Sequence, residues 1–113
     1  MHEMSLMQDV LDIIEEASRR DGFSKVKKVR LEIGALSCVD PAALDFCFDA
    51  VMRGSLAQEA VLEIVSLPGE GWCMTCSKPV EISERYDPCP CCGGYRVRVT
   101  GGEAMRVKEL EVE

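Results

Sequence analysis

Histidine is almost absent from this 113-residue chain, in which His2 is the only one. A Ser-His-Asp or Cys-His catalytic site needs an imidazole beside the nucleophile, and a single histidine at the second position gives no such arrangement of the usual kind. The glycine loops that bind nucleotides are missing too, since neither G-x-x-x-x-G-K-S/T nor G-x-G-x-x-G occurs. The sequence therefore predicts a protein that is not an enzyme.

Aromatic residues and long apolar runs are also scarce. Aromatics make up 5% of the chain against 47% for all hydrophobic residues, so an aliphatic core is expected. No apolar run approaches the ~20 residues of a membrane-spanning helix, and the first residues lack the basic-then-apolar order of a secretory signal. We expect a cytoplasmic protein with no membrane partner, built as one domain or as one domain with a small metal-stapled module.

The net charge of −7 is not balanced anywhere by a basic segment. Binding to nucleic acid depends on Lys and Arg side chains that neutralise phosphates, and this chain has no such basic surface. An acidic surface is better suited to basic patches on other proteins.

Residues 4–20 are expected to form an amphipathic helix that ends at the Asp-Gly sequence of residues 21–22. A capping box between Ser5 and Gln8 would leave the first four residues ahead of the helix. Alternatively, the helix begins nearer Glu3. The predicted apolar stripe consists of Leu6, Val10, Ile13, Ile14 and Ala17.

Three strands and a second helix are predicted in the rest of the chain. Residues 26–34 alternate between apolar and charged side chains, as a strand with one buried face requires. Asp40 and Pro41 provide an N-cap and a first helical residue for a helix that Gly54 closes. Further strands are expected at about residues 60–67 and 104–112. The last has a change of hydrophobic phase that suggests either a bulge or a strand that lies in two different surroundings.

Residues 69–102 differ in composition from the rest, because they hold most of the glycines and prolines and five of the seven cysteines. Such a segment buries too little apolar surface to fold without a staple. An odd number of cysteines in a cytoplasmic protein argues against disulfides and for a metal site.

Two C-x-x-C pairs, separated by twelve residues, predict that site: Cys73 with Cys76, and Cys89 with Cys92. Four thiolates at these spacings fit a closed tetrahedral site, which indicates a structural zinc ion; iron uses the same ligands and remains an alternative. Cys91 is then a bystander thiol or a weak alternate ligand. The other two cysteines, Cys38 and Cys47, are predicted to be small buried core residues.

The N-terminus carries a second candidate metal site. The terminal amine of Met1, the amide nitrogen of His2 and its imidazole can close two adjacent chelate rings on one ion, and tetragonal nitrogen ligands suit Ni(II) or Cu(II). The alternative is a solvated terminus that happens to contain a histidine.

The opening sequence Met-His-Glu-Met-Ser-Leu, the strand Val-Arg-Leu-Glu-Ile-Gly at residues 29–34 and the paired C-x-x-C motif together resemble the HypA/HybF family of hydrogenase-maturation nickel chaperones. The resemblance covers essentially the whole chain. It implies an α+β fold in which residues 1–68 and 103–113 form a nickel-binding domain of two helices and a three-stranded sheet. Residues 69–102 would be a zinc-ribbon-like module inserted before the last strand.

The resemblance also implies roles for particular residues. His2 matches the family's nickel histidine, Met1 would contribute its amine, and the backbone nitrogens of His2 and also of Glu3 would complete the square. The zinc ligands would be Cys73, Cys76, Cys89 and Cys92. The implied role is to pass nickel, with a GTPase called HypB, to the large-subunit precursor of a nickel–iron hydrogenase; some members serve urease maturation. No histidine flanks the cysteines here, so a histidine-based pH switch at the zinc site is not expected.

Two other classes of function remain open on the residues alone. One is a zinc-ribbon adaptor that binds another protein, and the other is a rubredoxin-like electron carrier with iron in the four-cysteine site. The expected oligomeric state is a monomer, with a weak or element-swapped homodimer as the alternative.

Overall fold

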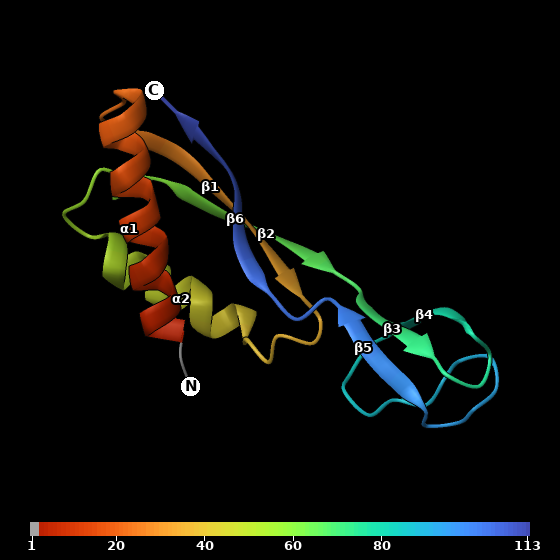
Figure 1. Ribbon diagram of the computed structural model, residues 1–113. Helices are drawn as coiled ribbons and strands as arrows, with labels where there is room; N and C mark the ends of the chain where they lie inside the picture. The colour runs from red at the N-terminus through yellow and green to blue at the C-terminus, as the bar shows by residue number, and fades with distance from the viewer. Residues whose placement is uncertain (1–2) are drawn as a thin grey trace. The chain divides into compact units, whose positions relative to one another are not determined.

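The computed structural model describes residues 3–113, in which there are two helices and six strands. In chain order they are α1 (Glu3–Asp21), β1 (Val26–Gly34), α2 (Pro41–Met52), β2 (Val61–Leu67), β3 (Gly69–Cys73), β4 (Lys78–Ile82), β5 (Val97–Gly101) and β6 (Met105–Val112) (Figure 1). The strands form two three-stranded sheets, in the orders β2-β1-β6 and β4-β3-β5. The predicted α+β fold, with a ribbon-like module inserted before the last strand, is confirmed.

The described residues divide into two compact units. The first contains the residues up to Leu31 together with Val39–Ile64 and Val107–Glu113, and the second contains Glu32–Cys38 and Val65–Arg106. The second unit extends beyond the predicted insert because Leu36 is part of its buried core, which also contains Cys73, Val80, Ile82 and Cys89. It stays a prediction that residues 1–68 and 103–113 bind nickel and that residues 69–102 bind zinc.

Helix α1 begins at Glu3, as the alternative boundary had it, so the predicted capping box is wrong. Ser5 is exposed within the helix, and the Gln8 side chain donates to Asp12 at 3.5 Å. The buried stripe is also rotated from the prediction, because Ile13 is 51% exposed whereas Met7 and Leu11 are buried. The members of this stripe, spaced by three and four residues, are Met7, Val10, Leu11, Ile14 and Ala17.

The predicted helix ends are confirmed by their hydrogen bonds. Gly22 has φ +80° and donates its N–H to the carbonyl of Ser18 at 2.8 Å, which ends α1. The carboxylate of Asp40 accepts from the N–H of Ala42 at 3.0 Å and caps α2. Within residues 3–113, neither helix has the length and apolar character needed to cross a membrane.

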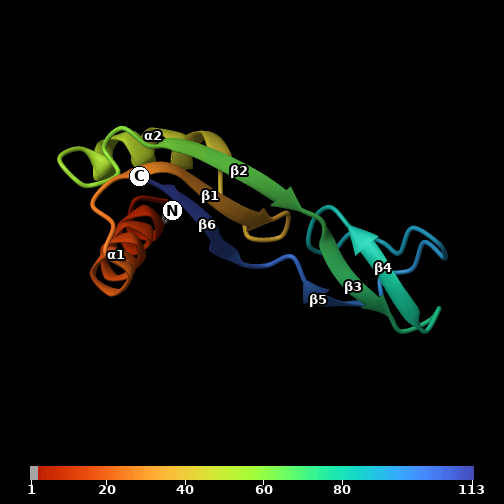
Figure 2. The same ribbon diagram turned by 90° about the horizontal axis from the view of Figure 1, so that it is seen from above.

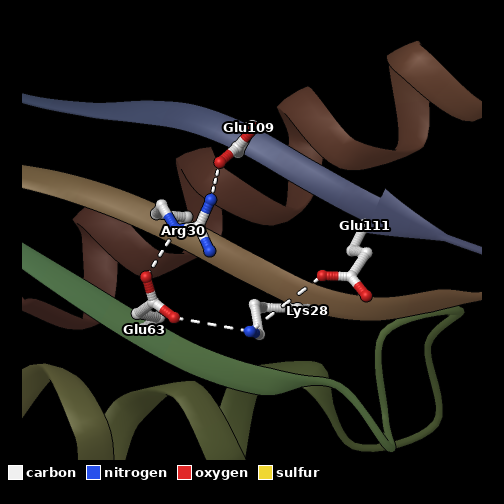
Figure 3. A network of polar contacts seen from close by, with 5 residues as sticks. All are labelled: Lys28, Arg30, Glu63, Glu109 and Glu111. Atoms are coloured by element: carbon white, nitrogen blue, oxygen red, sulfur yellow. Dashed lines mark hydrogen bonds and ion pairs between the residues drawn. The ribbon is translucent and has the colours of Figure 1, made fainter.

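One face of the first sheet carries charged side chains, and Figure 3 shows both helices behind the opposite face. Arg30 of β1 contacts Glu63 of β2 at 2.5 Å and also contacts Glu109 of β6. Lys28 lies 3.4 Å from Glu63 and 4.0 Å from Glu111. The hydrogen bond between Arg30 and Glu63 lowers the pKa of the Glu63 carboxyl and raises that of the guanidinium. On this face of the central strand, Lys28 and Arg30 are thus paired with carboxylates of both edge strands.

The second sheet has one covered face and one exposed face. Strand β3 pairs antiparallel with both β4 and β5, and Figure 2 shows β3 and β4 side by side. Alternate residues of β3 and β4 are buried, among them Cys73, Val80 and Ile82. Because Cys73 ends β3 on the covered face, this sheet places the first predicted metal ligand against the core of the unit.

Candidate metal centre

The four predicted zinc cysteines lie together in the second unit. Cys73 ends β3, Cys76 lies in the turn that follows, and Cys89 and Cys92 lie between β4 and β5. Their Sγ atoms are all within 4.8 Å of one another. The Sγ atoms of Cys73 and Cys92 are 3.8 Å apart, and those of Cys76 and Cys89 are 3.9 Å apart. A tetrahedral zinc ion with Zn–S bonds of about 2.3 Å requires sulfur separations of about 3.8 Å, so the array fits such an ion.

The two C-x-x-C turns are built alike, because each ends in a residue with a left-handed backbone. Ser77 has φ +53° and donates its N–H to the Cys73 carbonyl at 2.8 Å. Gly93 has φ +74° and donates to the Cys89 carbonyl at 2.9 Å. Glycine adopts this backbone without strain, so Gly93 suits its position, whereas the positive φ of Ser77 has no signal in the sequence because serine rarely adopts it.

Backbone N–H groups point at the first sulfur of each pair. The N–H of Cys76 donates to the Cys73 sulfur at 3.3 Å, and that of Cys91 to the Cys89 sulfur at 3.4 Å. N–H groups of Cys92 and Cys91 lower the pKa of the Cys89 thiol to about 6. Hydrogen bonds with the neighbouring Cys92 and Cys73 sulfurs raise the pKa of the Cys76 thiol to about 12. At neutral pH all four cysteines can be thiolates together only if a cation lies between them.

The remaining three cysteines lie outside this cluster. Cys91 is exposed, and its sulfur raises the pKa of the neighbouring Lys78. Cys47 is buried in α2, as predicted. The prediction of a buried Cys38 is wrong: it is exposed, in a turn where its φ is +62°. Residues other than glycine adopt a positive φ mostly in turns. The turn at Cys38 directs its side chain away from the core.

The nickel prediction concerns Met1, His2 and Glu3, and the first two lie outside the described residues. Glu3 is the first residue of α1 and is only 4% exposed. One carboxylate oxygen accepts the backbone N–H of Asp40 at 3.3 Å, and the other is buried with no hydrogen-bond partner among the described residues. No local sequence pattern indicates this contact, because the two residues are 37 positions apart in the chain. The contact turns the Glu3 side chain inward, away from solvent.

Comparison with known proteins supports the resemblance seen in the sequence. Residues 1–112 match the family model "Hydrogenase/urease nickel incorporation, metallochaperone, hypA". The chain is 60% identical to the "Hydrogenase maturation factor HypA 2" of Bradyrhizobium diazoefficiens, with 100% of both chains covered. It is also 60% identical to the hydrogenase maturation factor HypA of Albidiferax ferrireducens, again over 100% of both.

The fold is likewise similar to a solved structure. The solution structure of the Ni metallochaperone HypA from Helicobacter pylori superposes with a TM-score of 0.72 at 29% sequence identity, covering 99% of this chain and 97% of that one. The family model covers all three predicted nickel residues and all four clustered cysteines. The chain therefore belongs to the HypA family.

Proposed function

We propose that this protein binds Ni(II) at its N-terminus and delivers it to the large-subunit precursor of a nickel–iron hydrogenase during maturation. The observation that carries the proposal is that the chain belongs to a family whose description names nickel incorporation. The family model matches residues 1–112, which include the proposed nickel ligands. The sole histidine of the chain is at position 2, where amine, amide and imidazole nitrogens can form two fused chelate rings. Planar nitrogen ligands favour Ni(II) over zinc or magnesium.

The position of Glu3 supports a fourth nitrogen ligand. The first four N–H groups of a helix have no partner within the helix, and Glu3 is the first residue of α1. Its backbone nitrogen is thus not needed for the helix, while its carboxylate is held by the N–H of Asp40. In this proposal the ligands are the Met1 amine, the imidazole and backbone nitrogen of His2, and the backbone nitrogen of Glu3.

Such a set of ligands suits delivery as well as binding. The amine, the amide and the imidazole each take up a proton when they leave the metal, so protons compete with nickel. An incoming ligand from an acceptor protein can replace them one at a time. We expect nickel affinity to fall steeply below neutral pH.

The four-cysteine site is proposed to hold zinc in a structural role. Four protein sulfurs leave no coordination position for water or substrate, which is the pattern of structural zinc sites. Binding of a structural zinc ion stabilises the folded state by on the order of 10 kcal/mol. The second unit depends on this contribution because its own buried core is small. Iron in the same site would give a coloured protein, so an absorption spectrum distinguishes the two metals.

The family resemblance also guides the choice of partners. The proposed partners are a HypB-type GTPase and the hydrogenase precursor, with urease maturation proteins as a further possibility for the acceptor side. In this proposal the protein acts in the cytoplasm and is not an enzyme. The description of the family model names nickel incorporation into both hydrogenase and urease, which supports both kinds of acceptor.

Nickel calorimetry on three proteins tests the nickel proposal. They are the chain with its native amino end, the chain with that amine acetylated, and His2→Ala. We expect acetylation and the substitution each to weaken nickel binding more than about tenfold, since acetylation removes the amine ligand and the substitution removes the imidazole, and each loss opens a chelate ring. All three should keep one zinc per chain by elemental analysis. Equal nickel affinities in the three proteins would leave a zinc-ribbon adaptor as the better description.

A further inference from the structure

Strand β5 forms one edge of the second sheet. It pairs with β3 on one side, and no strand pairs with its other side within residues 3–113 (Figure 2). The strand at the opposite edge, β4, contains Lys78 and Pro79, which are residues of the kind that protect an edge from further pairing. Strand β5 has the sequence Val-Arg-Val-Thr-Gly, without lysine or proline and rich in the β-branched residues that favour strands. Its open edge is therefore suited to accept another strand.

The backbone groups on this open edge belong to Val97 and Val99. Residues of an antiparallel strand point their N–H and C=O groups alternately toward and away from the neighbouring strand. The Arg96 carbonyl accepts the N–H of Met74 at 2.8 Å, so Arg96 and Arg98 point their backbone groups inward, toward β3. Val97 and Val99 consequently point theirs outward, where a strand laid beside β5 is able to bond to them.

The side chains of the same two valines line a pocket of about 150 Å³, together with Ile82, Tyr86 and Tyr95. Both valines also pack against the buried core of the second unit, so the pocket lies on the covered side of the sheet. A cavity of about this size holds a single ring or one aliphatic side chain. It is smaller than the ~300 Å³ at which pockets for small molecules begin. One side chain of another protein therefore fits it better than a cofactor does.

The two charged residues of the pocket lining, Arg85 and Asp87, already have partners within the second unit. Arg85 pairs with Glu103 at 2.6 Å. The Asp87 carboxylate accepts the N–H groups of Ser83 and Glu84 at 3.2 and 3.0 Å. The surface that is left for a guest side chain is therefore apolar and aromatic.

Folding of the second unit does not account for the two tyrosines of this pocket. Tyr86 is 90% exposed and Tyr95 is 75% exposed, so neither contributes much to the core. Tyr86 also has φ +69°, a strained backbone for a bulky residue, and such strain is found mostly at functional sites. Exposed tyrosines are typical of surfaces that bind other proteins.

On its other face, β5 carries two arginines. Side chains alternate along a strand, so Arg96 and Arg98 lie on the face opposite to Val97 and Val99. Both arginines are exposed, and neither makes an ion pair in the part of the chain that the structure describes. A strand added to β5 would place every second side chain beside these guanidinium groups, where carboxylates are the complementary partners. A second copy of β5 would instead bring arginines together, which disfavours it as the occupant.

We propose that β5 binds an extended segment of a partner protein in which aliphatic and acidic residues alternate. The segment adds a strand to the open edge, a mode in which backbone hydrogen bonds give affinity and side-chain pockets give specificity. Its aliphatic residues lie opposite Val97 and Val99 and place one side chain in the pocket. Its carboxylates lie on the other face, beside Arg96 and Arg98. None of these residues is a proposed metal ligand, so this proposal goes beyond the proposed function and does not depend on it.

Two synthetic peptides of equal length test the charge preference. Glu alternates with Leu in the first, and Lys replaces every Glu in the second. In fluorescence anisotropy, the zinc-loaded, nickel-free full chain should bind the glutamate peptide at least about tenfold more tightly than the lysine peptide. The net charge of −7 makes this a strict test, because non-specific attraction would favour the lysine peptide.

A charge-reversed protein and a matched control locate the preference on β5. In Arg96→Glu/Arg98→Glu the lysine peptide should become the tighter ligand. Arg19→Glu/Arg53→Glu changes the net charge equally at two exposed sites of the first unit, and should keep the wild-type preference. Zinc content and circular dichroism establish that each variant is folded. A control that loses the preference as the β5 variant does would show that net charge is its cause, and would overturn the proposal.

Amide hydrogen exchange distinguishes strand addition from binding elsewhere on the surface. With the glutamate peptide bound, the N–H groups of Val97 and Val99 should exchange more slowly, whereas that of Arg98 already faces β3 and should change little. Tyr95→Ala should weaken binding of this peptide at least about fivefold, because it removes one wall of the pocket.

Several outcomes would overturn the proposal. They are equal affinities of the wild type for the two peptides, no binding of the glutamate peptide up to about 1 mM, unchanged exchange at the two valines, and an unchanged affinity in Tyr95→Ala. Slower exchange at Val97 and Val99 as protein concentration rises, without any peptide, would assign the edge to a second copy and overturn the proposal as well.

Discussion

The buried carboxylate of Glu3 accepts a hydrogen bond from the backbone N–H of Asp40 at 3.3 Å. Asp40 in turn caps α2 by accepting the N–H of Ala42 at 3.0 Å. The first residue of α1 is thus tied to the capping residue of α2, and the two helices are in contact. The start of α1, where the proposed nickel ligands lie, is held by this bond.

Glu3→Ala should destabilise the protein by about 1–3 kcal/mol, because the Asp40 N–H then loses its acceptor. Glu3→Gln keeps an acceptor oxygen and removes the charge of a carboxylate that has one unpartnered buried oxygen. It should therefore differ from wild type by less than about 1 kcal/mol. Urea unfolding measures both, with Glu16→Ala as the control at an exposed site of the same helix. If Glu3→Ala were as stable as that control, the hydrogen bond between Glu3 and Asp40 would not contribute to the stability of the protein.

The neighbouring cysteines 91 and 92 allow a matched test of the metal centre. Cys92 belongs to the sulfur cluster and Cys91 does not. Cys92→Ser should therefore lower zinc content well below one per chain, whereas Cys91→Ser should keep it. Elemental analysis after dialysis against a moderate chelator gives the answer. Loss of zinc in the Cys91 variant alone would mean that the ligand register is shifted by one residue.

Much of the fold was predictable because its signals are local. The Asp-Pro start of α2, the Asp-Gly end of α1 and the alternation in β1 each depend on residues that are neighbours in the chain. The choice of Cys92 over Cys91 followed from spacing, since both turns have the same backbone.

The features that were missed depend on contacts between distant segments. Two overlapping apolar stripes run along α1, and only packing selects the one with Met7 and Leu11 over the one with Ile13. The Glu3–Asp40 bond and the place of Leu36 in the second core join residues far apart in sequence. The exposure of Cys38 depends on a turn geometry that cysteine does not signal.

The ion pairs on the first sheet should make stability depend on pH in the acid range. Arg30 lowers the pKa of the Glu63 carboxyl, so the pair stabilises the protein fully above the carboxyl's unfolded pKa of about 4.3. That contribution is lost as pH falls through the lower pKa of the folded state. Glu63→Gln should reduce the melting temperature at pH 7 by a few degrees at most, as for pairs partly open to solvent.

The same variant should approach wild type in stability below about pH 4, and also in 1 M salt at pH 7. Thermal melts from neutral to acid pH test this. Asp9→Asn serves as the control, since Asp9 is exposed on α1 and makes no ion pair in the described part of the chain. A difference between Glu63→Gln and wild type that persisted unchanged into acid would show that its cause is packing and not charge.

Gly34 and Gly102 lie too close together for any side chain at position 34. A Cβ on Gly34 would be 2.1 Å from the Gly102 carbonyl oxygen. The backbones meet here because Gly34 donates to the Ala104 carbonyl at 3.0 Å and Leu36 donates to the Gly102 carbonyl at 2.8 Å. Since the obstacle is backbone, no change of rotamer relieves it.

Gly34→Ala should therefore cost about 2–4 kcal/mol, at the upper end of single substitutions, because relief requires these hydrogen bonds to lengthen. Gly94→Ala is the matched control. The nearest atom to its Cβ would be the Cys92 sulfur at 3.5 Å, an ordinary contact, and its φ is not positive. That variant should stay within about 1 kcal/mol of wild type and keep its zinc. Urea unfolding of both variants in the zinc-loaded state measures the difference; equal stabilities would show that the backbones at Gly34 and Gly102 can separate without cost. In that case the close approach would be incidental, and Leu36 would enter the second core without help from it.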